Sequence, residues 1–284
     1  MLTFPFCKIN LGLHIINKRP DGFHNIETVF YPVETITDVL EIIPSEQFDF
    51  QCFGVQIDGK KEDNLVVKAY NLMKQHYHLP PVSIFLLKNI PAGAGLGGGS
   101  SDAAFALKLI NTLFKLDLND EKLKEYASQL GSDCSFFIDN VPAIGQGKGN
   151  ELVPCVIPQL SEKQIVIVTP DVFVSTAEAY KSCKPTKRTT SLSEIISQPL
   201  HTWKDLLVND FEKTVFPLYP QLQKIKENLY QQGAVYASLS GSGGALYGIF
   251  DEKWKRVKTE GKMQYFHKNT RCHETKQTID IVCV

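Results

Sequence analysis

Residues 91–104 read PAGAGLGGGSSDAA, and this stretch decides how the chain is interpreted. It has glycine at positions 93, 95, 97, 98 and 99, and two serines and an aspartate follow. Glycine loses more backbone freedom on folding than any other residue, so a dense group of glycines inside a folded chain needs a reason. The apolar stretch 82–91 predicts a strand before the glycines, and the apolar spacing over 103–114 predicts an amphipathic helix after them.

A loop between a strand and a helix N-terminus is suited to a phosphate group. The first amides of a helix are unpaired and the helix end has about half a positive charge, so it attracts anions. Glycines allow successive amides to converge on one anion. Serine hydroxyls add hydrogen bonds, or contact the magnesium ion of a nucleotide. A plain turn with a helix cap would need one glycine and one serine, so the loop predicts a phosphate site.

Two other phosphate-binding patterns were compared with this loop. Gly93, Gly95 and Gly98 satisfy G-x-G-x-x-G, and Asp117 lies at about the distance of a ribose-binding acid. Asp117, however, lies between two predicted helices and does not end a second parallel strand. The P-loop pattern fails because no lysine follows the last glycine. An NAD-dependent oxidoreductase therefore stays open only as a weak alternative.

The composition is that of an ordinary soluble globular protein. The 284 residues are 43% hydrophobic and 21% charged, with a formal net charge of −1. This balance gives no reason to expect a nucleic-acid partner, and no apolar segment reaches the ~18–20 residues of a membrane helix. The seven scattered cysteines lack a C-x-x-C pair, and the first residues lack a signal-peptide core. We expect a cytoplasmic protein, and its cysteines and histidines lack the spacing of a metal site.

The remaining patterns predict alternating strands and helices in two domains. Prolines and weak periodicity at 150–162 place the boundary, which gives domains 1–157 and 158–284. A helix over 63–77 is expected to be capped by Asp63 or Asn64. Ser175 and Glu178 form a capping-box pattern. Strands are expected at 8–16, 26–33, 37–44, 164–170, 235–240 and 245–250, and helices also at 120–130 and, as two helices broken near Pro217 and Pro220, at 203–232.

Residues 91–104 resemble, without a gap, the central phosphate-binding motif of the GHMP kinases, the superfamily of galactokinase and of homoserine, mevalonate and phosphomevalonate kinases. Four further stretches resemble the branch whose acceptor is a cytidine diphosphate-linked methylerythritol. They are KINLGLHIINKRPDGFHNIETVF (8–30), GSDCSFFI (131–138), VNDFEKTVFPLYP (208–220) and SLSGSGGALYGIF (238–250). The resemblance extends over nearly the whole chain.

This resemblance implies an α+β fold with two domains and an active site in the cleft between them. The first domain would have a left-handed βαβ arrangement that binds the nucleotide, and the second would be ferredoxin-like. The implied reaction is ATP-dependent phosphorylation of the acceptor's 2-hydroxyl with Mg²⁺, in isoprenoid precursor biosynthesis. The alternatives are another GHMP small-molecule kinase and a silent nucleotide-binding module. The sequence does not give the oligomeric state.

The resemblance also assigns roles that the residues alone do not. Taken alone, Asp133 would be a turn former or a cap, and Lys8 would be a solvated lysine at the start of a strand. The family motif G-A-D-x-P-F-F makes Asp133 the base that takes the acceptor's proton, with Lys8 beside it to keep the carboxylate ionised. Ser132, Ser135 and Cys7 replace the Ala, Pro and Ala of the family pattern.

The remaining site residues divide into a nucleotide group and an acceptor group. For Phe23, a buried strand residue is an equal alternative, and SGSGG (240–244) could be a plain hairpin turn. Lys88 and Asn64 resemble positions on the nucleotide side. The loop expected to bind ATP comprises Pro91, Ala92, Gly93, Ala94, Gly95, Leu96, Gly97, Gly98, Gly99, Ser100 and Ser101. The residues expected to bind the acceptor are Asn10, Phe23, His24, Tyr180 and Gly241.

Overall fold

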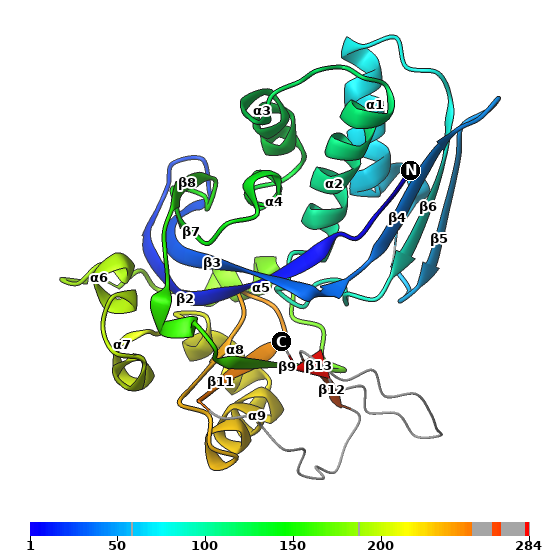
Figure 1. Ribbon diagram of the computed structural model, residues 1–284. Helices are drawn as coiled ribbons and strands as arrows, with labels where there is room; N and C mark the ends of the chain where they lie inside the picture. Colours follow the sequence, from blue (N-terminus) through cyan, green and yellow to red (C-terminus); the bar gives the residue numbers. More distant parts are fainter. Residues whose placement is uncertain (58, 187, 252–262, 268–281, 284) are drawn as a thin grey trace, which may run out of the picture. The chain divides into compact units, whose positions relative to one another are not determined.

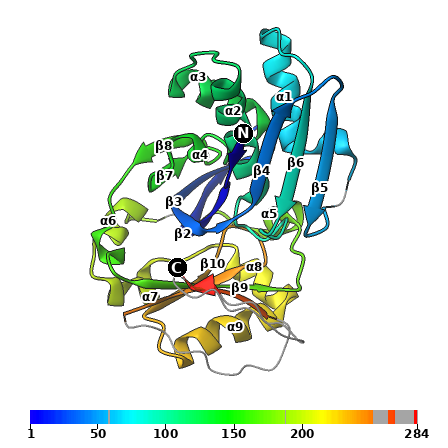
Figure 2. The same ribbon diagram turned by 45° about the vertical axis from the view of Figure 1, so that its right-hand side comes forward.

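The computed structural model describes residues 1–57, 59–186, 188–251, 263–267 and 282–283 (Figures 1 and 2). The chain forms two compact units, and each is assembled from separate segments. Unit 1 comprises Met1–Lys8, Ile36–Ala92 and Gly97–Val141. Unit 2 comprises Ile9–Thr35, Gly93–Leu96 and Pro142–Val284. The glycine loop is thus shared, with residues 93–96 in unit 2 and the residues on both sides of them in unit 1.

Unit 1 is built on a four-stranded sheet. The sheet has the order β1-β4-β6-β5, and β5 runs parallel to β6. Two parallel strands need a crossover, and helix α1 provides it, so β5, α1 and β6 form the βαβ unit that the resemblance implied. Burial alternates along β6, which brings the Lys88 side chain to the buried face. The strands are β1 (Leu2–Thr3), β4 (Val39–Pro44), β5 (Asp49–Gly54) and β6 (Val82–Lys88).

The helices of unit 1 pack around helix α2, which contacts α1, α3, α4 and strand β4 (Figure 1). The predicted helix at 103–114 is confirmed, and it begins earlier, at Gly98. Its face of small and apolar residues at 103, 106, 107 and 110 is completely buried. Helix α3 follows α2 where a dinucleotide-binding fold would have a parallel strand, which removes that alternative. The helices are α1 (Leu65–His76), α2 (Gly98–Leu113), α3 (Asp120–Leu130) and α4 (Phe136–Asp139), with a 3-10 turn η1 (Lys61–Asp63).

Two sheets account for the strands of unit 2, although the ends of β2 and β3 extend into unit 1. The first has the order β2-β3-β7-β8 and the second the order β10-β11-β9-β12-β13. Strands β9, β10, β11 and β12 follow one another in the chain as strands 1 to 4. In the sheet they lie side by side in the order 2-3-1-4 with antiparallel pairing, which is the ferredoxin-like arrangement. The strands are β2 (Phe6–Lys18), β3 (His24–Thr37), β7 (Ala143–Gln146), β8 (Glu151–Pro154), β9 (Gln164–Pro170), β10 (Tyr236–Leu239), β11 (Leu246–Phe250), β12 (Met263–His267) and β13 (Val282–Cys283).

The helices of unit 2 correct one prediction. The two helices expected over 203–232 are three, and the last break falls at Tyr219. Pro217 lies inside α8, where it removes one hydrogen bond of a helix that ends one residue later. Pro220 begins α9, at the position where a missing N–H costs nothing. The helices are α5 (Thr176–Ser182), α6 (Leu192–Ile196), α7 (Trp203–Leu206), α8 (Glu212–Leu218) and α9 (Pro220–Gln231), with 3-10 turns at Pro158–Leu160 and Leu200–Thr202.

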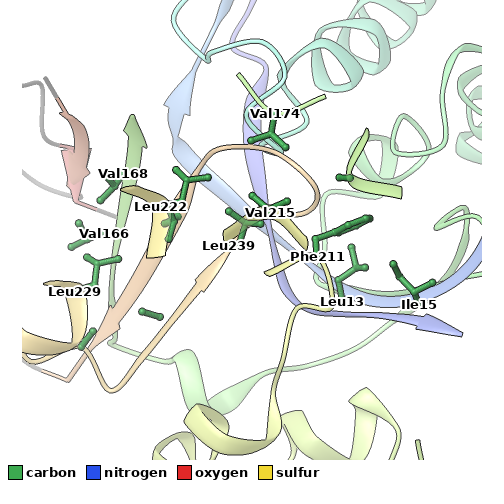
Figure 3. Packing of buried hydrophobic residues seen from close by; sticks show 14 of the residues in the cluster. Leu13, Ile15, Val166, Val168, Val174, Phe211, Val215, Leu222, Leu229 and Leu239 are labelled. Atoms are coloured by element: carbon green, nitrogen blue, oxygen red, sulfur yellow. The ribbon is translucent and has the colours of Figure 1, made fainter. Parts of the chain in front are cut away.

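The core of unit 2 joins these helices to its strands (Figure 3). Leu13 of β2 and Phe211 and Val215 at the start of α8 belong to the same buried cluster as residues of β9, α9 and β10. The predicted strands and the helices at 63–77 and 120–130 are confirmed, with Asn64 as the N-cap of α1. Among the helices that the structure describes, none has the length and apolar character that a membrane crossing needs.

Candidate active site

The first half of the glycine loop touches the second glycine-rich stretch. A Cβ atom built on Gly95 would lie 1.9 Å from the Ser240 carbonyl oxygen, and one on Gly243 would lie 2.1 Å from the Ala94 carbonyl carbon. Real Cβ atoms almost never approach closer than 3.0 Å. Two hydrogen bonds join the segments, from Ser240 Oγ to the Gly95 oxygen (2.9 Å) and from the Ala245 amide to the Ala94 oxygen (3.0 Å). Glycine is required at 95 and 243 because two backbones meet there.

The second half of the loop forms the N-terminus of helix α2. Gly97 is its N-cap in the left-handed region (φ +71°), and its carbonyl accepts the Ser101 amide at 2.9 Å. Within the described part of the chain, the amides of Gly98, Gly99 and Ser100 have no protein acceptor. These are the unpaired groups that a helix start offers to an anion.

Lys8 and Asp133 lie together beside this helix start, all within unit 1. Lys8 Nζ is 3.4 Å from Asp133 Oδ2, and a Cβ atom at Gly97 would lie 3.1 Å from Lys8 Cε. Lys8 is 3% exposed, whereas the side chain of Asp133 is 32% exposed. Burial lowers the pKa of Lys8, and the charge and hydrogen bond of Asp133 oppose that effect. A buried cation is therefore paired with a carboxylate that solvent can reach.

The segment that carries Asp133 is fixed by its neighbours. Helix α3 ends at Gly131, whose carbonyl accepts the Cys134 amide at 3.1 Å. Ser135, which stands where the family has proline, donates its hydroxyl to the Lys124 carbonyl at 3.2 Å. Residues 136–138 are buried in the short helix α4. Apolar burial on one side and a tie to α3 on the other hold the Asp133 turn in place.

A buried charge cluster joins both ends of the glycine loop. The Lys88 ammonium hydrogen-bonds to Asp38 and, at 2.7 Å, to Asp102 on helix α2. Asp38 also accepts the Ile90 amide at 2.9 Å, where the chain enters the loop. Burial would lower the pKa of Lys88, but the two carboxylates raise it above its ordinary value. Burial raises the pKa of Asp102 to about 8, against the opposing charge of Lys88.

A pocket of about 460 Å³ lies in unit 1 and is lined by residues of strand β5 and of the segment between β5 and helix α1. Asn64 lines it and caps α1 by accepting the Val66 amide at 2.9 Å. The next residue, Leu65, has its Cδ1 atom 3.8 Å from a Cβ atom built on Gly99, so the pocket lies close to the loop. The lining residues are Phe50, Cys52, Phe53, Gly54, Val55, Gln56, Ile57, Gly59, Lys60, Lys61, Asp63 and Asn64.

Two of the expected acceptor residues stack on each other in unit 2. The rings of His24 and Tyr180 lie 5.1 Å apart at an interplanar angle of 20°, and Tyr180 meets Phe211 edge to face. Burial and the charge of Lys18 lower the pKa of His24. The loosely assigned Tyr180 thus lies beside His24.

Phe23 is not a buried strand residue, so that alternative is wrong. It precedes β3 and is 58% exposed. Lys148 Nζ lies 4.2 Å from the centre of the Phe23 ring and forms an ion pair with Asp21 (3.1 Å). An exposed ring beside a cation is a surface on which another planar group can stack.

Asn10 and Gly241 also lie together in unit 2. Asn10 is buried, donates from Nδ2 to Thr28 Oγ1 (2.9 Å), and has its Oδ1 atom 3.0 Å from a Cβ atom built on Gly241. Gly241 is in the left-handed region at φ +58°. Its turn joins the antiparallel strands β10 and β11, so SGSGG is a hairpin turn that also contacts the glycine loop.

Three residues of these clusters were missed by the sequence analysis. Asp38 and Lys148 have ordinary surroundings in sequence, and their partners Lys88 and Phe23 lie far along the chain, so no local pattern marks them. Asn209 donates a hydrogen bond to the Gly241 carbonyl and so holds that turn. It lies within the 208–220 stretch, but no pattern in that stretch predicts its contact with Gly241.

Known proteins match both parts of the chain. The model for the GHMP kinases N terminal domain matches residues 64–148, and the model for the GHMP kinases C terminal domain matches residues 191–264. A crystal structure of 4-(cytidine 5'-diphospho)-2C-methyl-D-erythritol kinase superposes with a TM-score of 0.76 at 29% identity, covering 92% of this chain and 91% of that one. A mevalonate kinase from Methanococcus jannaschii has a TM-score of 0.65 at 14% identity, covering 89% and 92%, and shows the shared fold alone. The fold is that of the GHMP kinases.

Curated relatives with similar sequences indicate which family of the GHMP kinases the chain belongs to. The 4-diphosphocytidyl-2-C-methyl-D-erythritol kinase of Bacteroides fragilis is 52% identical over 264 residues, which is 92% of this chain and 96% of the relative. The protein of the same name from Cytophaga hutchinsonii is 46% identical over 270 residues, or 95% and 96%. The chain belongs to the 4-diphosphocytidyl-2-C-methyl-D-erythritol kinase family of the GHMP kinases. It is a kinase, and ATP is one of its substrates.

Proposed function

We propose that the chain transfers the γ-phosphoryl group of ATP to the 2-hydroxyl of 4-diphosphocytidyl-2-C-methyl-D-erythritol. The products are the 2-phosphate and ADP, in isoprenoid precursor biosynthesis. The observation that carries the proposal is the Lys8–Asp133 pair at the N-terminus of helix α2. A carboxylate, a cation and an anion-binding helix end are the three groups that transfer to a hydroxyl needs.

ATP binds to unit 1 with its base and ribose in the 460 Å³ pocket. From there its phosphates extend to the amides of Gly98, Gly99 and Ser100. Leu65, which follows Asn64 of the pocket lining, lies 3.8 Å from a Cβ atom built on Gly99. Lys88 acts through Asp102 and does not touch the nucleotide with its buried ammonium. Pro91 to Leu96 complete the loop and join it to the second glycine turn.

Asp133 accepts the proton of the acceptor's 2-hydroxyl, and its exposure leaves room for that hydroxyl. Lys8 stabilises the charge on Asp133 and on the attacking oxygen. Because Lys8 is buried and held by Asp133, its ammonium is already oriented before the reactants bind. The chain's own residues therefore position the nucleophile and move its proton, as phosphoryl transfer requires.

Mg²⁺ fits this site by the chemistry of its donors. The hydroxyls of Ser100 and Ser101 and the carboxylate of Asp133 are the hard oxygen ligands that it prefers, and Mg²⁺ usually needs only one or two protein ligands beside phosphate and water. Ser101 Oγ is buried and has no hydrogen-bond partner among the described residues. When bound, the ion neutralises charge on the phosphates.

The acceptor binds to unit 2. Its cytosine stacks on the aromatic groups of Phe23, His24 and Tyr180, and the exposure of Phe23 favours such stacking. Asn10 contacts the acceptor, and Gly241 with its turn provides backbone amides to phosphate. The functional domains are 1–157 and 158–284, each of which contains one of the two matched regions.

Two properties of the protein in the cell are also proposals. The cysteines at 52, 134, 155 and 183 are free thiols, which supports a cytoplasmic location. The partners are small molecules, and neither nucleic acid nor a membrane is among them.

The test is release of ADP in the presence of Mg²⁺, ATP and the cytidyl acceptor. We expect turnover by the native chain and competition by CMP against the acceptor but not against ATP. Homoserine or mevalonate as the better acceptor would refute the proposed substrate. Tight ATP binding without turnover on any acceptor would support a silent module.

A separate variant tests the base. We expect Asp133→Asn to lower kcat about 100-fold or more with smaller changes in KM, because it removes the proton acceptor and keeps the shape. A kcat within about 3-fold of the native value would make Asp133 a positioning residue.

A further inference from the structure

The sequence NDFE at 209–212 has no place in the reaction as described so far. Its three polar side chains all bind backbone groups of unit 2. Asp210 accepts the Ile15 amide at 3.0 Å, and Glu212 accepts the Leu239 amide at 3.0 Å. Asn209 reaches the turn between β10 and β11, which contains Gly241. The first two hold strands, whereas Asn209 holds a turn that is proposed to bind phosphate.

The Asn209 side chain uses both of its N–H donors on this task. It is 2% exposed, and its Nδ2 group donates to the carbonyl oxygens of Leu239 (2.9 Å) and Gly241 (2.8 Å). Its Oδ1 atom accepts the Phe211 amide at 3.0 Å, which fixes the orientation of the amide group. An aspartate would turn two attractive contacts into repulsion between oxygens, so the amide is chemically required.

The backbone of Asn209 is itself anchored independently of the turn. The Leu13 amide donates to the Val208 carbonyl at 3.0 Å, and the Asp210 amide donates to the Leu13 carbonyl at 2.8 Å. Strand β2 therefore fixes the chain on both sides of Asn209. A side chain on a fixed backbone can set the geometry of a glycine-rich turn, which has little conformational preference of its own.

The planarity of the peptide bond gives this contact a direction. In a trans peptide the C=O and the following N–H point in opposite directions. The Leu239 carbonyl points to Asn209, and the Ser240 amide accordingly points away and donates to the Ala245 oxygen at 2.8 Å. By the same geometry, holding the Gly241 carbonyl turns the Ser242 amide away from Asn209. In the described part of the chain that amide has no protein acceptor.

We propose that Asn209 is a positioning residue that aims the Ser242 amide at the phosphoryl group in transfer. The turn lies against Ala94 and Gly95 of the phosphate loop, which favours the transferred group over a more distant phosphate. This inference rests on the proposed kinase reaction. An amide that is oriented before the reaction stabilises developing charge without reorganising, so its effect belongs to kcat.

The experiment compares Asn209→Ala with Val215→Ala by steady-state kinetics and urea unfolding. Val215 is fully buried in the core of the same unit, and its apolar side chain can form no hydrogen bond to the turn, so its variant reports the effect of lower stability without loss of such a bond (Figure 3). We expect Asn209→Ala to lower kcat about 30-fold, with KM for ATP and for the acceptor within about 3-fold. We expect Val215→Ala to keep kcat within about 2-fold.

The outcomes of these measurements separate the inference from the proposed function and from a loss of stability. Turnover by the native chain together with an unchanged kcat for Asn209→Ala overturns the inference, whereas no turnover by the native chain refutes the proposed function instead. An equal fall in kcat for Val215→Ala also overturns it, because stability would then explain the loss. If Asn209→Ala does not fold, Asn209→Ser replaces it, because serine keeps one hydroxyl donor. We expect the kcat of Asn209→Ser to fall by less than the 30-fold expected for Asn209→Ala. A native kcat for Asn209→Ser overturns the inference.

Discussion

Replacing Gly95 by alanine tests whether two backbones need to touch at the glycine loop. The new Cβ atom would lie 1.9 Å from the Ser240 oxygen, and the closest approach that real Cβ atoms tolerate is 3.0 Å. The two segments must therefore separate by about 1.1 Å, the difference of those two distances. Hydrogen bonds of 2.9 and 3.0 Å between the segments would lengthen to about 4 Å and be lost.

The expected loss of stability has two parts. Two hydrogen bonds contribute about 1 kcal/mol each. Alanine in the left-handed region, where Gly95 has φ +81°, costs about 1–2 kcal/mol more. Gly233 offers a matched control, because it also has positive φ (+94°) but has nothing within 4 Å of a built Cβ. Gly95→Ala should thus destabilise by about 3–4 kcal/mol and Gly233→Ala by about 1–2 kcal/mol.

Urea unfolding followed by tryptophan fluorescence measures the difference between the two variants. We expect Gly95→Ala to be less stable than Gly233→Ala by about 2 kcal/mol, and to lose turnover as well because the second glycine turn moves. Equal free energies of unfolding, within about 0.5 kcal/mol, would refute the reasoning. The glycine at 95 would then be needed for its φ angle alone.

Three further predictions test other parts of the site. ATP should slow the alkylation of Cys52, which lines the pocket, without changing the alkylation of Cys155. Burial raises the pKa of Cys52, so its alkylation should be faster at pH 9 than at pH 7. Equal rates with and without ATP would place the adenine base of ATP outside this pocket. Lys88→Met should lower the free energy of unfolding by about 3–5 kcal/mol, because it leaves two buried carboxylates without a counter-ion. Asp102→Asn should lower the free energy of unfolding by less. Equal decreases for the two variants in urea unfolding would contradict this prediction. Burial lowers the pKa of Lys8 below 10.5. Just below that pH the unfolded chain therefore binds more protons than the native chain, so the free energy of unfolding should rise with pH relative to that of Lys8→Met. The measurement is urea unfolding from pH 7 to 10, and a constant difference between the two proteins would disprove the pKa shift.

The elements that depend on near neighbours in the chain were predictable. The apolar spacing at 103–114 and the cap at Asn64 identified helices, because both signals involve residues within a few positions of each other. The break near Pro217 and Pro220 was predicted correctly, since it falls at Tyr219, whereas the earlier break between α7 and α8 was missed. The glycine loop was identifiable as a candidate phosphate site because its glycines and serines are contiguous.

The candidate site was predictable only where a family motif supplied it. Lys8 and Asp133 carry no local signal, and their pairing at 3.4 Å depends on β2 and the α3–α4 turn meeting at the start of α2. The partners of Asp38 and Asn209 are likewise distant in sequence. Contacts of this kind follow from sheet order and helix packing, for which a single sequence has no direct signal.

The sequence by itself determined that this chain has a glycine loop between a strand and a helix, and that the loop suits phosphate. It did so because backbone freedom and helix-end charge are local properties. Only the tertiary structure decided that Gly95 and Gly243 are glycines because two loops meet there. It alone showed that both ends of the phosphate loop are held by one buried charge cluster. The physical reason is that steric room and a buried counter-ion belong to the space around a residue, which folding brings together from distant parts of the chain.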